Sequence, residues 1–229
     1  MIAPVISGDG FDRYNIWNHS TAVRELYARR ARNEEAEMTC AAQAAELLAE
    51  IVRPGESILD AGCGAGHFYH SLARRTVELD YYGIDATRSF ISIARDSLAA
   101  FGVPTDHLQV MCIEDLDGAT DHVVCMNVLT YLDNFHRPLE RLLRTARSSL
   151  ILRESLKSVG EYRYVADRYL DDGAELNVHI NSYDRDELLA VIEREGFTTR
   201  LVTDRRSGGE PELSIGYPHH WQFVVATRR

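Results

Sequence analysis

Three glycines and two acidic residues form the most specific pattern in the sequence. The run Asp60-Ala61-Gly62-Cys63-Gly64-Ala65-Gly66 follows a short apolar segment and precedes a segment with helical spacing. Glycine adopts positive φ angles and lets a ligand approach the backbone closely. A second acid, Asp85, ends the next apolar run, where a carboxylate can accept hydrogen bonds from the two hydroxyls of a ribose. The pattern therefore predicts a site for a nucleoside cofactor.

A dinucleotide site is the main alternative for this loop. Its fingerprint is GxGxxG, whereas His67 stands here at the position of the third glycine. An acid two positions before the first glycine also suits a cationic ligand better than a pyrophosphate. A nicotinamide-dependent oxidoreductase of the same fold type remains an open alternative, as does a tight turn that binds nothing.

The elements around this loop alternate between strand and helix patterns. Such alternation is typical of a mainly parallel α/β sheet with helices on both faces. We expect a single domain over residues 1–229. Two helices precede the sheet, at 18–32 and 34–52. The expected strands are at 57–60, 81–85, 108–113, 122–126, 150–152, 198–203 and 222–227.

With these motifs the sequence resembles the class I S-adenosylmethionine-dependent methyltransferases. The resemblance is carried by ILDAGCGAG (58–66), YYGIDAT (81–87), VMCIEDL (110–116) and VCMNVLTYL (124–132). It covers residues 48–154 well and the later helix and strands more loosely. It implies a Rossmann-like sheet of seven strands in the order 3-2-1-4-5-7-6, with the last strand antiparallel. It also implies S-adenosyl-L-methionine as cofactor and S-adenosyl-L-homocysteine as product.

The resemblance further implies roles for individual residues of the cofactor site. The methionine end would be lined by Asp60, Gly62 and Gly64, and the ribose would be held by Asp85. The remaining contacts would come from Ala86 and Ile113 at the adenine, with Glu114 nearby, and from the Met126 carbonyl at the amino group, with Asn127 beside it. Many members have Asp where this chain has Cys112. Either Glu114 replaces that acid, or the backbone alone holds the adenine.

Residues on the acceptor side follow the strand ends. Our candidates for catalytic roles are Tyr131 and His136 after the fourth strand, Arg153 after the fifth, and His179 in an insert at 155–183 that we expect to cover the site. The alternatives are structural. His136 would then only begin a helix, and Arg153 would form an ion pair with the surface at the end of the strand. We expect residues 1–47 to form a helical lid, with Tyr14 and Trp17 over the cofactor or, alternatively, packed between the two helices.

Composition and charge limit the classes of molecule that we expect the protein to bind. The chain has 229 residues and a net charge of −10, from 25 basic and 35 acidic side chains. An acidic surface argues against nucleic acids and anionic membranes. The four cysteines have no CxxC spacing, so we expect reduced thiols, no metal site and a cytoplasmic location.

The predicted function is methyl transfer from S-adenosylmethionine to an oxygen or nitrogen atom of a small molecule. A small acceptor follows from a single compact domain with no added RNA- or protein-binding module, together with the acidic charge. Methylation of a sugar or of a protein side chain is an alternative. A catalytically silent subunit that binds the cofactor is another, and the oligomeric state stays open.

Overall fold

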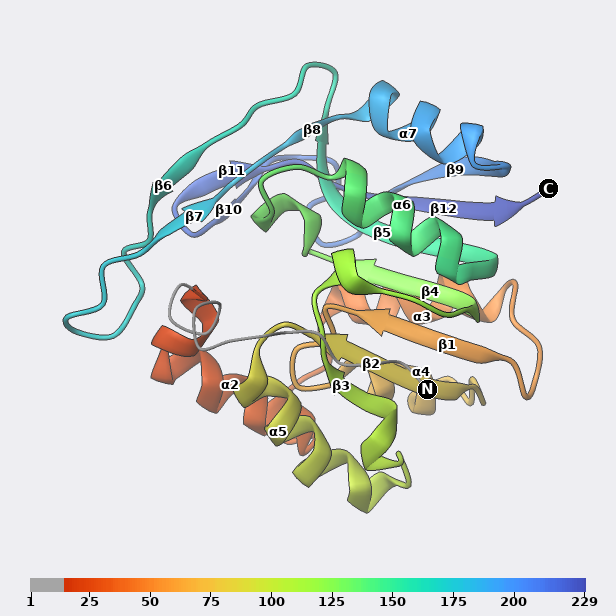
Figure 1. Cartoon of the computed structure of the whole chain (residues 1–229), viewed down its shortest axis with the longest axis horizontal. Coiled ribbons are helices and arrows are strands. Elements are labelled where there is room, and N and C mark those ends of the chain that lie inside the picture. The colour runs from red at the N-terminus through yellow and green to blue at the C-terminus, as the bar shows by residue number, and fades with distance from the viewer. Residues whose placement is uncertain (1–14) are drawn as a thin grey trace.

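The computed structural model describes residues 15–229, which are built around one twisted sheet (Figure 1). Its main path runs in the order β3-β2-β1-β4-β5-β12-β9. Only β12 is antiparallel to its neighbours, so the predicted strand order is confirmed. The strands are β1 (Ser57–Ala61), β2 (Asp80–Asp85), β3 (Leu108–Val110), β4 (Thr120–Met126), β5 (Ala146–Lys157), β9 (Phe197–Thr203) and β12 (Trp221–Arg228).

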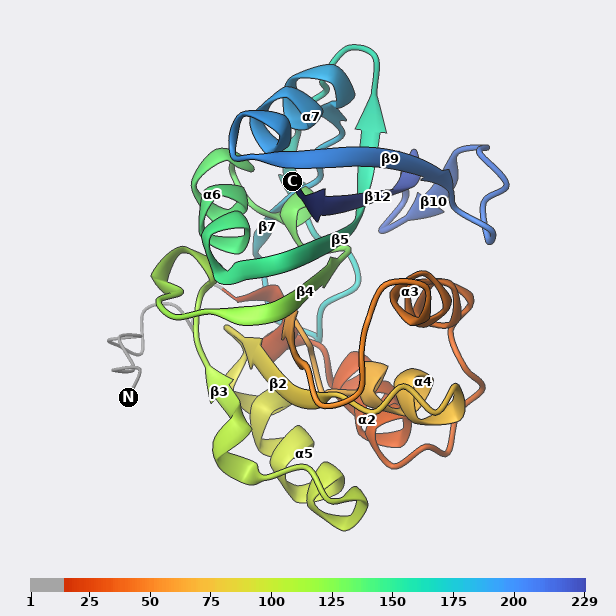
Figure 2. The same cartoon turned by 90° about the vertical axis from the view of Figure 1, so that its right-hand side faces the viewer.

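Helices cover both faces of this sheet. On one face lie α3 (Thr39–Ala49), α4 (Phe68–Arg74) and α5 (Arg88–Leu98), and on the other lie α6 (His136–Thr145) and α7 (Arg185–Arg194). Figure 2 shows α6 and α7 on the opposite side of the strands from α3 and α4. Short 3-10 helices complete the connections: η1 (Ile16–His19), η2 (Ala99–Phe101), η3 (Thr105–His107), η4 (Ile113–Asp115) and η5 (Leu129–Tyr131).

Alternation along the central strands builds two hydrophobic cores. Leu59, Val123 and Leu150 pack in the cluster that contains the apolar side chains of α6 and α7. Their chain neighbours Ile58, Val124 and Ile151 pack in the cluster of α3, α4 and α5. Successive side chains of a strand point to opposite faces, so a strand buried on both sides reads as one continuous apolar run.

The two N-terminal helices are shorter than expected. Helix α2 spans Thr21–Ala31, and α3 begins only at Thr39. Asn33 has a φ of 61°, a left-handed conformation that asparagine tolerates after a helix end. The turn at 32–38 therefore replaces the single-residue break that we expected between the helices. Seven residues of α3 are buried, and this helix packs in the core beside α4.

Two hairpins project beyond the carboxyl ends of the parallel strands. The first, in the segment 155–183, pairs β6 (Tyr164–Ala166) with β7 (Asn177–His179), and the short β8 (Tyr183–Asp184) then joins the end of β5. The second pairs β10 (Glu212–Ser214) with β11 (Tyr217–His219) and was not predicted. Figure 1 shows both hairpins on the same side of the molecule as α2.

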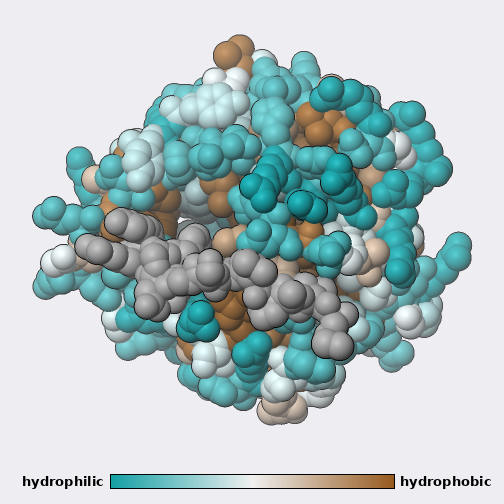
Figure 3. Space-filling view, in the orientation of Figure 1, coloured by the Kyte–Doolittle hydropathy of each residue, from teal (hydrophilic) through white to brown (hydrophobic). Residues whose placement is uncertain are grey.

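Polar side chains dominate one face of the molecule. The face seen in Figure 3 is mostly hydrophilic, with apolar side chains in small patches between polar ones. In residues 15–229, no helix has the length and apolar character that crossing a membrane requires.

Candidate functional site

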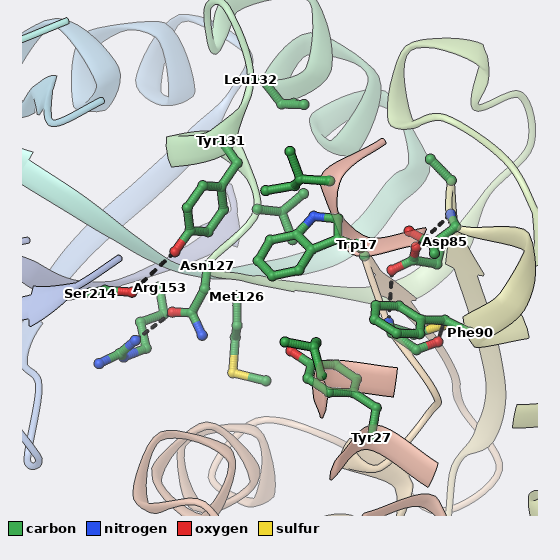
Figure 4. A pocket seen from close by; sticks show the side chains of 18 of the residues that line it. Trp17, Tyr27, Asp85, Phe90, Met126, Asn127, Tyr131, Leu132, Arg153 and Ser214 are labelled. Atoms are coloured by element: carbon green, nitrogen blue, oxygen red, sulfur yellow. Dashed lines mark hydrogen bonds between the residues drawn. The ribbon is translucent and has the colours of Figure 1, made fainter. Parts of the chain in front are cut away.

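A pocket of about 690 Å³ lies where the parallel strands end. Its floor includes residues from the ends of β1, β2 and β4, and Arg153 from the middle of β5, a strand that continues past the expected residue 152 to Lys157. Its other walls come from η1 and α2, from the β6–β7 hairpin and from the β10–β11 hairpin. Ligands of open α/β sheets bind at this edge. Figure 4 shows side chains from η1, α2, β2, β4, β5 and β10 converging on one space.

The glycine loop has a shape that only glycine fits. Gly62 has a φ of 78°, and a Cβ atom there would lie 2.3 Å from Val128 Cγ2. Gly64 has a φ of 55°, and its Cβ would lie 2.6 Å from Tyr27 Cε1. The loop thus presents bare backbone to the pocket between β1 and α4, as the spacing of the glycines predicts.

Asp60 is a buried acid without a cationic partner among the described residues. Its side chain accepts a hydrogen bond from the Tyr81 hydroxyl at 2.7 Å, and the residue is only 3% exposed. Burial raises the pKa of Asp60 to about 7, and the neighbouring Asp85 adds to this rise. A positively charged ligand in the pocket is therefore the natural counter-ion for this carboxylate.

Asp85 ties the glycine loop to the end of β2. Its Oδ2 accepts from the Gly64 amide at 2.8 Å, and its Oδ1 accepts from the Thr87 amide at 2.7 Å. The Thr87 hydroxyl also bonds to this carboxylate, so one of its roughly four lone-pair sites remains free to accept a ribose hydroxyl. Burial raises the pKa of Asp85 as well.

The pocket contains most of the residues that the resemblance assigns to the cofactor. Its lining includes Trp17, Asp60, Gly62, Gly64, Asp85, Ala86, Ile113, Glu114, Met126 and Asn127. Tyr14 lies outside the described residues. Cys112 also lines the pocket, and burial raises the pKa of its thiol to about 11, which keeps it uncharged.

The turn after β4 is held by a buried carboxyl group beneath it. Glu154, fully buried within β5, accepts backbone hydrogen bonds from Val128, Leu129 and Thr130, each at 3.0 Å. Although these donors lower the pKa of Glu154, burial outweighs them and raises it to about 7. The next residue of the turn is Tyr131, so Glu154 fixes the backbone that carries this pocket side chain.

Arg153 lines the pocket but is already paired. Its Nε donates to Asp204 at 2.7 Å, and its Nη1 donates to the side-chain oxygen of Asn127. The guanidinium lies over the Trp221 ring, with its carbon 4.4 Å from the ring centre. Arg206 pairs in the same way with Glu212 at 2.6 Å. The positive charges at this end of the pocket are therefore neutralised by the chain itself.

Aromatic rings wall the pocket between its two ends. Trp17 meets Tyr131 edge to face, with ring centres 5.4 Å apart. Tyr27 stacks on Phe90 with centres 4.6 Å apart, beside the glycine loop. The tyrosine hydroxyl of Tyr131 lies 3.3 Å from the Ser214 hydroxyl of the second hairpin.

The four catalytic candidates do not all reach the pocket. Tyr131, Arg153 and His179 line it. His136 does not, because α6 begins at this residue on the surface, where its ring lies 3.1 Å from Glu187 and is 56% exposed. No group of three potential metal ligands occurs within residues 15–229.

Several pocket residues escaped sequence reasoning. Tyr27 sits in a helix whose apolar face looks like ordinary core packing, and Asp204 and Glu212 lie more than 50 residues from the Arg153 they neutralise. Trp221 also lines the pocket. The available signal for the second hairpin was the run Tyr217-Pro218-His219-His220-Trp221, whose aromatic density is unusual.

Comparisons with known proteins agree with this site. The model of the family described as "Methyltransferase domain" matches residues 29–202. The ubiquinone biosynthesis O-methyltransferase of Saccharomyces cerevisiae, a mitochondrial protein, is 35% identical over 83 residues, which cover 35% of this chain and 27% of that protein. The enzyme of the same name from Chromobacterium violaceum is 34% identical over 82 residues, 34% of each chain. The matches thus span about a third or less of these relatives.

Solved structures share the architecture over nearly the whole chain. Magnesium protoporphyrin IX methyltransferase from Synechocystis PCC 6803, with bound S-adenosylhomocysteine, superposes with a TM-score of 0.62 at 17% identity, covering 95% of this chain and all of that one. A methyltransferase from Clostridium acetobutylicum ATCC 824 gives the same TM-score at 11% identity, covering 89% and 96%. At such identities the likeness is one of fold.

Proposed function

Because the chain belongs to the family of S-adenosylmethionine-dependent methyltransferase domains, we propose that it methylates a hydroxyl oxygen of an uncharged small molecule. The cofactor supplies an electrophilic methyl group on a sulfonium. The chain must then hold this cation, align an acceptor oxygen behind the methyl group and exclude competing water.

The residues of the chain fit the cofactor. Asp60 supplies a buried negative charge with no cation of its own among the described residues. The loop backbone at Gly62 and Gly64 carries no side chain, and a Cβ atom at either position would collide with Val128 or Tyr27. Asp85 keeps a lone pair for a ribose hydroxyl. We assign these residues to the methionine end, the loop contact and the ribose, respectively.

The proposal that the acceptor is uncharged rests on two arginines of the pocket that are already paired with acidic side chains. A carboxylate or phosphate is normally clamped by a free guanidinium, but Arg153 and Arg206 already bind Asp204 and Glu212. The outer rim is instead apolar, since Tyr164 and Leu213 line the pocket while 62% and 73% exposed. An uncharged acceptor with an apolar body suits this lining.

Oxygen is favoured over nitrogen as the methylated atom. The neutral hydrogen-bonding groups at this end, Tyr131, Ser214 and Asn127, match a hydroxyl. An amine would be protonated at neutral pH and would first have to lose a proton. Two relatives that share the matched segment are named O-methyltransferases.

Two measurements test this proposal. Calorimetry should show S-adenosylhomocysteine binding that Asp85→Ala abolishes, while binding of NADH instead would favour an oxidoreductase. Transfer of a tritiated methyl group should then be followed with a panel of uncharged phenols and alcohols beside amines and carboxylic acids of similar size. Methylation confined to amines or acids would overturn the acceptor assignment. Cofactor binding without any transfer would favour a silent subunit.

A further inference from the structure

The side-chain amide of Asn127 is held in one orientation. Arg153 Nη1 donates to the Asn127 oxygen, and a guanidinium has donors only. The amide nitrogen must therefore point away from Arg153. Figure 4 shows it turned from the guanidinium into the space beside Met126. Within residues 15–229 this nitrogen has no hydrogen-bond acceptor, so its two N–H groups face the pocket unpaired.

The partner that fixes this amide is itself immobile. Arg153 is 3% exposed, bound to Asp204 and covered by Trp221. The Asn127 backbone has a φ of 59°, a left-handed angle that few residues other than Gly, Asn and Asp adopt without strain. The backbone N–H of Asn127 also donates to the backbone carbonyl of Arg153 at 2.8 Å. Backbone and side chain are thus fixed by the same residue.

The amide lies on the acceptor side of the pocket. In Figure 4, Asn127 groups with Arg153, Ser214 and Tyr131, while Asp85 lies at the opposite end beyond Trp17. Asn127 directly follows Met126, the last residue of β4, at the middle of the sheet edge. A cofactor extended from Asp85 toward β4 would present its methyl group to this cluster.

We propose that the Asn127 side-chain nitrogen donates a hydrogen bond to the acceptor oxygen that becomes methylated, and that Arg153 is the positioning residue that aims it. This inference rests on the proposed function. The acceptor oxygen would form its bond to the methyl carbon as that carbon leaves sulfur, and the hydroxyl proton would pass to bulk solvent at the open rim lined by Tyr164 and Leu213. A fixed donor at that oxygen stabilises the negative charge that gathers there as the proton leaves.

Phenol, bound to protein saturated with S-adenosylhomocysteine, is the probe that tests the inference. The NMR signals of the Asn127 side-chain NH₂ group are assigned in ¹⁵N-labelled protein. They are the signals that disappear from the spectrum of the Asn127→Asp variant. Titration with phenol should shift these two signals saturably, and toluene should not. Aspartate keeps the left-handed backbone and the pairing with Arg153, but it presents an acceptor in place of the donor. We therefore expect phenol affinity, measured with S-adenosylhomocysteine at saturation, to fall at least about fivefold. Saturation is established separately for the variant, because Asn127 stands beside Met126, whose carbonyl the resemblance assigns to the amino group of the cofactor.

Two further variants separate orientation from charge. Asn134→Asp makes the same charge change on an exposed turn whose side chain accepts from the His136 amide, and it should leave phenol binding unchanged. Arg153→Lys keeps a cation beside Asp204 but loses the fork that reaches Asn127, so the amide signals should move and phenol should bind about threefold more weakly.

The results that would overturn this inference differ from those that would overturn the proposed function. Failure of the wild-type protein to bind S-adenosylhomocysteine would remove the proposed function itself. With the cofactor bound, unshifted Asn127 signals, absent phenol binding, or equal phenol affinity in Asn127→Asp would overturn the role of Asn127. Amide signals that stay in place in a folded Arg153→Lys protein would overturn the positioning role of Arg153.

Discussion

The Tyr81 hydroxyl donates a 2.7 Å hydrogen bond to Asp60 inside the protein, where both side chains are buried. This bond satisfies one oxygen of the carboxylate but brings no positive charge. Burial therefore keeps the pKa of Asp60 at about 7, against an ordinary value of 3.8. The state of this carboxylate near neutral pH then depends on whether a cation occupies the pocket.

The affinity for S-adenosylmethionine should rise with pH. Only ionised Asp60 attracts the cation, and with a pKa of about 7 the ionised fraction grows about tenfold between pH 6 and 8. Calorimetry across this range should show up to about a tenfold gain in affinity. Asp60→Asn should bind more weakly and without the pH dependence. Equal slopes for both proteins would exclude Asp60 as the titrating group.

Replacing Tyr81 by Phe provides a sharper check of the same bond. The hydrogen bond from Tyr81 lowers the pKa of Asp60 against the effect of burial. Its removal should shift the midpoint of the affinity profile to higher pH. A midpoint that stays in place would show that the bond does not tune this carboxylate.

Glu154→Gln should destabilise the protein by about 1–3 kcal/mol. Glu154 accepts three backbone N–H groups, whereas glutamine would turn its own NH₂ toward one of them. Urea unfolding measures this loss. The matched control is Glu140→Gln on α6, whose partner Arg144 is exposed, and it should change stability by less than about 0.5 kcal/mol. Equal effects of the two substitutions would contradict the buried role of Glu154.

The same carboxyl predicts how stability depends on pH. The pKa of Glu154 is about 7 in the folded protein and 4.5 by default, so the folded state binds more protons than the unfolded state between these values. Its contribution to the free energy of unfolding is full below about pH 4.5 and is lost as pH rises through about 7. The cofactor-free protein should therefore lose stability from pH 5 to 7, and Glu154→Gln should flatten this slope.

Local sequence patterns predicted which residues meet at the ends of β1 and β2, but they did not predict the surroundings of Arg153. Asp60 and Asp85 lie at the carboxyl ends of β1 and β2, and Gly62 directly follows β1, so strand order alone brings them together. The surroundings of Arg153 depend on Asp204, which arrives through the antiparallel pairing of β9 with β12. No spacing rule predicts such a contact.

For His136, closeness in sequence to a pocket residue gave a wrong prediction. It is only five positions from Tyr131, which suggested a shared location, yet the start of α6 turns it to the surface. The β10–β11 hairpin was missed because its strands have three residues each, too few for an alternating pattern. Helix and strand identity could thus be predicted over the core, but the acceptor wall could not.

Gly64→Ala should abolish cofactor binding. A methyl group there would lie 2.6 Å from the Tyr27 ring, at a φ of 55°. Gly173→Ala is the matched control, because Gly173 also has a positive φ, 85°, but nothing lies within 4 Å of its Cβ position. Both variants should lose about 1 kcal/mol of stability through the backbone. Only Gly64→Ala should lose S-adenosylhomocysteine binding by calorimetry, and adding Tyr27→Ala should restore part of it.

Asp171 connects two walls of the pocket, and its removal should loosen both. Its carboxylate accepts from the Thr21 amide at 2.9 Å and from the Thr21 hydroxyl at 2.8 Å, which caps α2 from the segment between β6 and β7. The Asp171 amide in turn donates to the His19 carbonyl at 2.8 Å. Asp171→Ala should cost about 1 kcal/mol and speed amide hydrogen exchange in α2 and β6–β7 together. Asp172→Ala, a substitution of the exposed next residue, should change neither. Faster exchange in α2 alone would mean that the two walls move independently.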